Sequence, residues 1–95
     1  MIGKSIYKVP DGKLVKISLE FEGNKINSVK ITGDFFLHPE EGLELIEKNL
    51  VGVELTESEL VEKINEAAKV NDLELFGLNS EGVAKAILMA KENPQ

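Results

Sequence analysis

The feature that most constrains the fold is a strict alternation of apolar and polar residues from Lys13 to Glu22. One face carries Val15, Ile17, Leu19 and Phe21, and the other carries Lys16, Ser18, Glu20 and Glu22. A period of two is typical of a β-strand with one buried face. The chain therefore has to cover one side of a sheet with apolar packing and leave the other side in water.

A hairpin follows this strand. The pair Gly23-Asn24 suits a tight turn that needs positive φ, and residues 26–32 run back with Val29 and Ile31 on one face. Ile26 is out of phase with that pair. Either a bulge lies near Asn27-Ser28, or Ile26 faces away from the core.

Weaker signals place the other elements. Residues 6–9 predict a short strand that ends at the turn 10–12, and helical spacing predicts helices from near Pro39 to Leu50, from 56 to 71, and from Ser80 onward. The segment 56–59 has the pattern of a capping box. Strands come first and helices later, which predicts an α+β fold with a small antiparallel sheet of about three strands followed by about three helices packed on one face. With 95 residues there is room for one core, so residues 1–95 are expected to form a single domain.

Charge is distributed unevenly. Residues 1–30 carry six lysines and three acids, whereas residues 31–95 carry five lysines and fourteen acids, and the net charge is -6. All eleven cations are lysine. Arginine grips phosphates and base edges bidentately, so its absence argues against nucleic-acid binding. The basic segment of residues 1–30 could contact an anion that is bound by another molecule.

Cysteine is absent from the chain, which excludes a disulfide, a thiol nucleophile and any cysteine-ligated metal or iron-sulfur cluster. The cytoplasm is therefore the expected compartment. The apolar stretches are far shorter than the roughly 20 residues that span a bilayer, so we expect neither a membrane segment nor a signal peptide.

Candidate chemistry is sparse. His38 is the only histidine, and Asp34, Glu40 and Glu41 reach it only if the chain folds back, so a solvated loop histidine is the favoured interpretation over a base or a metal ligand. Helical spacing scatters the glutamates of residues 40–47 over different faces, which favours a solvated acidic face over a cation site. We expect no catalytic residue and no metal ligand in this chain.

Two features are candidates for contact with another molecule. Gly12-Lys13 lacks the remaining residues of a phosphate loop, which leaves Lys13 either as a contact to an anion in a partner's site or as a strand-end lysine in water. Phe35 and Phe36 are adjacent, so in an extended segment one ring enters the core while the other faces out as an interface anchor. The alternative is that the loop and helices bury both rings.

Several segments together resemble the C-terminal accessory domain of lipoate-protein ligases. They are residues 13–17, the turn at Gly23-Asn24, Ile26 with Val29 and Ile31, Gly33-Asp34-Phe35-Phe36, and residues 46–52. The resemblance extends over nearly the whole chain. Its most specific part is the segment from Gly33 to Phe36, followed by a helix that ends in Leu50-Val51-Gly52.

The resemblance implies a function. In that family a large catalytic domain binds lipoate and ATP, forms lipoyl-adenylate and transfers the lipoyl group to a lysine of an acceptor protein, while the accessory domain packs over it and supports adenylation. Because this chain begins at its own Met1 and contains nothing like a catalytic domain, we expect the free-standing small subunit of a bipartite ligase. Lipoate, ATP and magnesium are then expected on the catalytic large subunit of a heterodimer. The acceptors would be lipoyl-domain or glycine-cleavage carrier proteins.

The family fold is also similar to that of iron-sulfur scaffold and sulfur-transfer proteins, whose functions need cysteines that are absent here. Asp34, Phe35 and Phe36 are the expected interface residues, with the Asp34 carboxylate accepting backbone N–H bonds in the turn before Pro39. Two other interpretations remain open at this point. One is a protein-interaction adaptor of the same fold in another complex, and the other is a small enzyme that uses His38.

Overall fold

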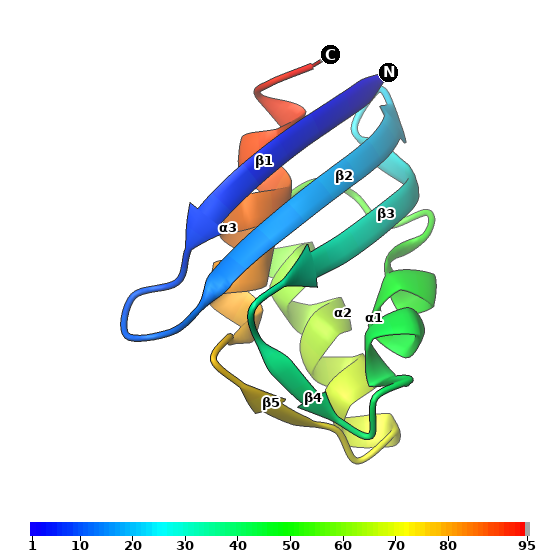
Figure 1. Cartoon of the computed structure of the whole chain (residues 1–95). Helices are drawn as coiled ribbons and strands as arrows, with labels where there is room; N and C mark the ends of the chain where they lie inside the picture. Colours follow the sequence, from blue (N-terminus) through cyan, green and yellow to red (C-terminus); the bar gives the residue numbers. More distant parts are fainter. Residues whose placement is uncertain (95) are drawn as a thin grey trace.

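The computed structural model describes residues 1–94, with Phe36 described by its backbone alone. The elements in chain order are β1 (Ile2–Lys8), β2 (Leu14–Glu22), β3 (Lys25–Gly33), β4 (Phe36–His38), α1 (Gly42–Leu50), α2 (Glu57–Val70), β5 (Glu74–Phe76) and α3 (Ser80–Lys91) (Figure 1). The α+β prediction is confirmed, with a three-stranded antiparallel sheet and three helices in the described part of the chain. The first strand is longer than the predicted 6–9, because it begins at Ile2.

The main sheet has the order β1-β2-β3 and is antiparallel throughout. Its register changes near the hairpin: Glu20 pairs with Ser28, but the next residue, Phe21, pairs with Ile26, which leaves Asn27 as the extra residue. Ile26 is consequently turned inward and is 1% exposed. The bulge alternative is therefore the correct one, and it brings Ile26 into the core.

A second, two-stranded sheet joins β4 to β5 and was not predicted. The pairing places Leu37 opposite Leu75, with Leu37 buried. The turn expected before Pro39 is thus corrected, since Phe36–His38 is a strand. Three residues are too few to show a period of two, and the partner strand lies far along the sequence, so no local pattern indicates this pairing.

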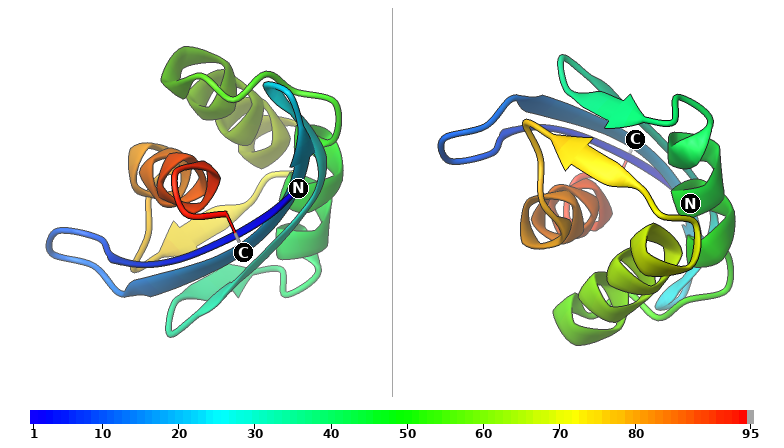
Figure 2. Two further views of the ribbon diagram at one scale, coloured as in Figure 1. Left: turned by 90° about the horizontal axis from the view of Figure 1, so that it is seen from above. Right: turned by 90° about the horizontal axis from the view of Figure 1, so that it is seen from below.

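The helices cover the concave side and one edge of the main sheet. Helix α3 packs against β1 and β2, α2 packs against α1 and α3, and α1 packs against β3. Figure 2 shows α2 and α3 inside the curve of the sheet, whose opposite face is left uncovered. The apolar face predicted for β2 is the buried one, and its four residues are at most 5% exposed. Burial of each such side chain contributes about 1.5–3 kcal/mol.

The helix starts differ in detail from the prediction. Helix α1 begins at Gly42, because Pro39 lies in a preceding turn in which its carbonyl accepts the Gly42 N–H at 3.0 Å. At α2, Thr56 Oγ1 accepts the Glu59 N–H at 3.4 Å, which is half of the predicted capping box. Helix α3 begins at Ser80, as predicted, and Asn79 caps it by accepting the Gly82 N–H at 2.6 Å.

Both outer strands of the main sheet have partners along part of their free edges. At the β3 edge, the Ile31 N–H donates to Glu47 Oε2 of α1 at 2.8 Å, and the Gly52 N–H donates to the Ile26 carbonyl at 2.8 Å. At the β1 edge, the Lys4 N–H donates to the Asn93 carbonyl at 3.4 Å. Unpaired edges are templates for aggregation, so these contacts limit the exposed backbone to short segments.

Candidate partner-binding surfaces

Three chain segments meet at one end of the main sheet, and we call this place the turn junction (residues 12–13, 33–35 and 77). The Lys13 N–H donates to the Gly77 carbonyl at 2.6 Å, which ties the β1–β2 turn to the segment between β5 and α3. The Asp34 N–H donates to the Leu14 carbonyl at 3.2 Å, which ties the end of β3 to the start of β2. The predicted residues Lys13, Asp34 and Phe35 therefore lie in one neighbourhood.

Glycine makes this close approach possible at two positions. Gly77 has φ +84°, and a Cβ there would lie 2.5 Å from Lys13 Cγ and 3.7 Å from Phe35 Cα. Gly33 has φ +154°, and a Cβ there would overlap the Leu14 carbonyl oxygen. Side chains at either position would clash and would need a backbone conformation that L-residues rarely adopt. The close packing at the turn junction thus explains why position 33, in the segment that carried the family resemblance, is a glycine.

The predicted interface residues at the turn junction have different environments. Lys13 and Asp34 are exposed, while Phe35 is half-buried against the core and lines a groove of about 320 Å³ with Leu37 and Leu43. The Asp34 carboxylate accepts none of the backbone hydrogen bonds expected for it within the described residues. The Phe36 side chain lies outside what the structure describes, so the expectation of one inward and one outward ring remains a prediction.

His38 is exposed on β4 and lies opposite Glu74 of β5. The cross-strand neighbour is therefore Glu74, and not one of the sequence-adjacent acids considered from the sequence. Among residues 1–94, no group of three or more His, Asp and Glu side chains is arranged to hold a metal ion.

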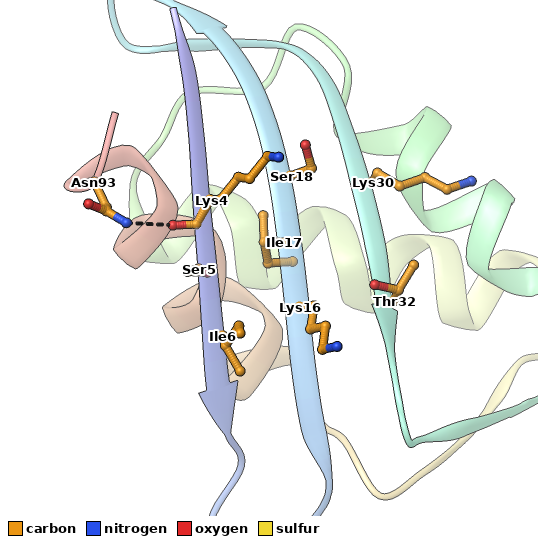
Figure 3. A pocket seen from close by; sticks show the side chains of 9 residues that line it. All are labelled: Lys4, Ser5, Ile6, Lys16, Ile17, Ser18, Lys30, Thr32 and Asn93. Carbon is orange, nitrogen blue, oxygen red and sulfur yellow. Dashed lines mark hydrogen bonds between the residues drawn. The ribbon is translucent and has the colours of Figure 1, made fainter. Parts of the chain in front are cut away.

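A second surface is the uncovered face of the main sheet. We define the basic sheet face as Lys4, Ser18, Lys30, Ile6, Lys16 and Thr32. The strand register sets them in two adjacent rows across β1, β2 and β3. The first row is Lys4, Ser18 and Lys30, and the second is Ile6, Lys16 and Thr32. They line a shallow depression of about 540 Å³, and Figure 3 shows these side chains on the side of the sheet away from the helices.

The lysines of this face are exposed, and none of them has an acidic partner in the described part of the chain. The one ion pair among residues 1–94 joins Lys63 to Glu66 at 3.6 Å. Glu20 occupies the neighbouring row of the sheet, between Ile2 and Ser28. The alternation in β2 already put Lys16 and Ser18 on the solvent side, but the addition of Lys4 and Lys30 requires the register of all three strands. The basic segment is therefore visible in the sequence, whereas the cluster is visible only in the fold.

This geometry defines a small α+β domain with two solvent-facing surfaces suited to contact with another molecule. The sequence profile of the bacterial lipoate protein ligase C-terminus matches residues 7–87. The chain belongs to this family. The resemblance drawn from the segments around Gly33 to Phe36 is thereby confirmed.

Two relatives come from Thermoplasma acidophilum. Lipoate-protein ligase A subunit 2 is 36% identical over 53 residues, which are 56% of this chain and 50% of the relative, so the match spans half the length of that protein. A chain from a structural analysis of an archaeal lipoylation system, described as a bi-partite lipoate protein ligase and its E2 lipoyl domain, has a TM-score of 0.69 at 28% identity. That alignment covers 92% of this chain and 94% of the other. Within residues 1–94, no helix is both long and apolar enough to cross a membrane.

Proposed function

We propose that this chain is the non-catalytic accessory subunit of a bipartite lipoate-protein ligase. It binds a separate catalytic subunit and supports the ATP-dependent activation of lipoate to lipoyl-adenylate, which precedes transfer to lysines of acceptor proteins. Lipoyl-domain or glycine-cleavage carrier proteins are the proposed acceptors, and the cytoplasm is the proposed compartment. Lipoate, ATP and magnesium bind to the catalytic subunit in this proposal.

The observation that carries the proposal is the family match over residues 7–87. Further support comes from the relative that is itself named as subunit 2 of a ligase, and from the similarity of nearly the full chain to a chain of a bi-partite ligase. Both surfaces described above are open to solvent, a shape that suits contact with another protein better than enclosure of a small substrate.

The proposed contribution to the reaction is physical. Adenylation benefits when water is excluded and the reacting groups are held in place, and a domain that closes over the site supplies both effects without a catalytic side chain of its own. Lys13 lies at the turn junction with its ammonium exposed, where it is available to an anion at the edge of a partner's site. Phe35 packs against the core at the same turn junction.

The test is reconstitution. The purified chain is mixed with the catalytic subunit from the same organism, and lipoate-dependent release of pyrophosphate is measured with and without the chain. We expect clear stimulation over the catalytic subunit alone. Absence of stimulation at a concentration at which the two proteins form a complex would reject the proposal.

Lys13→Ala refines this test. We expect it to slow adenylation more than it weakens association, because the side chain would act on an anion rather than hold the subunits together. Lys69→Ala is the matched control, since Lys69 is also an exposed lysine but lies on α2, away from the turn junction. Equal rates for the two variants would make Lys13 an ordinary surface lysine.

A further inference from the structure

The basic sheet face gathers three lysines that have no ion-pair partner among residues 1–94. Lys16 lies on the central strand, and Lys4 and Lys30 lie one row away on the two outer strands. Diagonal neighbours in an antiparallel sheet are separated by roughly 7–8 Å, so the three ammonium groups repel one another. They occupy one rigid sheet, and an interaction with them costs little backbone ordering.

The acidic residues are mostly elsewhere. Exposed glutamates are distributed over the helices, among them Glu44 of α1, Glu62 and Glu66 of α2, and Glu81 of α3. A chain of net charge -6 thus has a helical side rich in acids and a sheet face lined by three lysines and no acid, with Glu20 in the next row and Glu44 and Glu47 of α1 beside Lys30 at the β3 edge. Such an asymmetry orients the molecule in the field of a charged partner and raises the rate of productive encounter.

We propose that the basic sheet face is the docking surface for an acidic surface of the catalytic subunit. This inference rests on the proposed function and adds to it the face and the partner chemistry. Charge complementarity is the main argument. Apolar contact is available beside the lysines, because Ile6 is 61% exposed within the face and Ile2 is 46% exposed in the next row. The hydroxyls of Ser18 and Thr32 can donate hydrogen bonds to carboxylates between the ammonium groups.

Two other occupants fit the surface less well. A nucleic acid is disfavoured because all the cations are lysine and the whole chain repels a polyanion at long range. A second copy of this chain would have to place its acidic helices on the sheet face of the first. That contact is heterologous, so it leaves a free face at each end and extends into filaments instead of closing.

The test is a charge reversal at the centre of the face. Lys16→Glu is compared with Lys69→Glu, which changes the net charge equally on the helical side. Binding to the purified catalytic subunit is followed by surface plasmon resonance at several salt concentrations, and circular dichroism checks that both variants are folded. We expect Lys16→Glu to raise the Kd about tenfold, mostly through a lower association rate, while Lys69→Glu stays within about twofold. Lys16→Gln should fall between Lys16→Glu and the wild-type chain.

The wild-type Kd should also rise as salt is increased from about 50 to about 500 mM, because the Debye length shortens. Equal affinities for Lys16→Glu and Lys69→Glu, or a Kd independent of salt, would overturn this inference and leave the proposed function standing. No wild-type binding at all would overturn both. Lys16→Glu is also tested for self-association and for oligonucleotide binding. If the variant loses either of these while it still binds the catalytic subunit as the wild-type chain does, the face belongs to that other occupant and the inference is overturned.

Discussion

Glu47 offers the sharpest test of how the edge of the main sheet is protected. Its carboxylate accepts the Ile31 N–H at 2.8 Å, and Ile31 lies on β3 with its side chain fully buried. Glu47 itself is half-buried on α1. The perturbation is Glu47→Ala, which removes the acceptor and leaves the Ile31 N–H without its partner.

The expected cost follows from this geometry. Hydrogen bonds to charged groups contribute about 1.5–3 kcal/mol, and an unsatisfied buried donor costs about 1–3 kcal/mol. Because water reaches the half-buried Glu47 position in part, we expect Glu47→Ala to lower the free energy of unfolding by about 2 kcal/mol. For a domain of this size, that corresponds to a fall in Tm of roughly 8–16 °C. Glu47→Gln keeps an acceptor and should cost about half as much.

The assay is urea unfolding followed by far-ultraviolet circular dichroism, with two-state behaviour checked against thermal unfolding. Glu62→Ala is the control, because Glu62 is an exposed helical glutamate on α2. We expect the control to stay within about 0.5 kcal/mol of the wild-type chain. If Glu47→Ala were no more destabilising than Glu62→Ala, the Ile31 N–H would not depend on this carboxylate, and the reasoning about the β3 edge would be refuted.

Three further predictions can be checked by the same unfolding assay or by binding. Asn79→Ala should cost about 1 kcal/mol through loss of the α3 cap, whereas Asn79→Asp should keep most of the stability; equal loss in both would argue against capping. Gly77→Ala should destabilise by more than about 1 kcal/mol, since φ is +84° and Cβ would lie 2.5 Å from Lys13 Cγ; a neutral effect would show that the turn junction relaxes easily. Phe35→Ala should weaken association with the catalytic subunit by about 2 kcal/mol while unfolding stays cooperative, and unchanged affinity would remove Phe35 from the interface.

Local patterns predicted the parts of this fold that depend on local physics. The alternation through β2 identified the buried face correctly, because successive side chains of a strand point to opposite faces and the apolar face is the buried one. The phase error at Ile26 left two alternatives, a bulge or an outward-facing side chain, and the register decided for the bulge. The Thr56 cap was equally local, since donor and acceptor lie three residues apart.

The parts that escaped prediction depend on contacts between distant residues. Strand β4 exists because Leu37 pairs with Leu75, and no pattern within three residues reveals such a partner. The basic sheet face depends in the same way on the register that sets Lys4 and Lys30 in one row. For the candidate site, the sequence indicated Asp34, Phe35 and Phe36 as one interface segment and Lys13 apart from it as an anion contact. Gly77 contacts both Lys13 and Phe35 in the fold, but nothing in the sequence around it predicted this position.

The order in which this chain leaves the ribosome has a consequence for how it matures. Strand β1 is synthesised before α3, yet Ser5 Oγ donates to the carbonyl of Ala86, and the Lys4 N–H donates to the carbonyl of Asn93. The first strand therefore stays incomplete until the last helix has been synthesised. Contacts of such large sequence separation slow the final folding step. A nascent chain that ends before α3 would leave the apolar side of β1 and β2 without the helix that packs on it, so we expect the fold to be completed only after α3 has been synthesised.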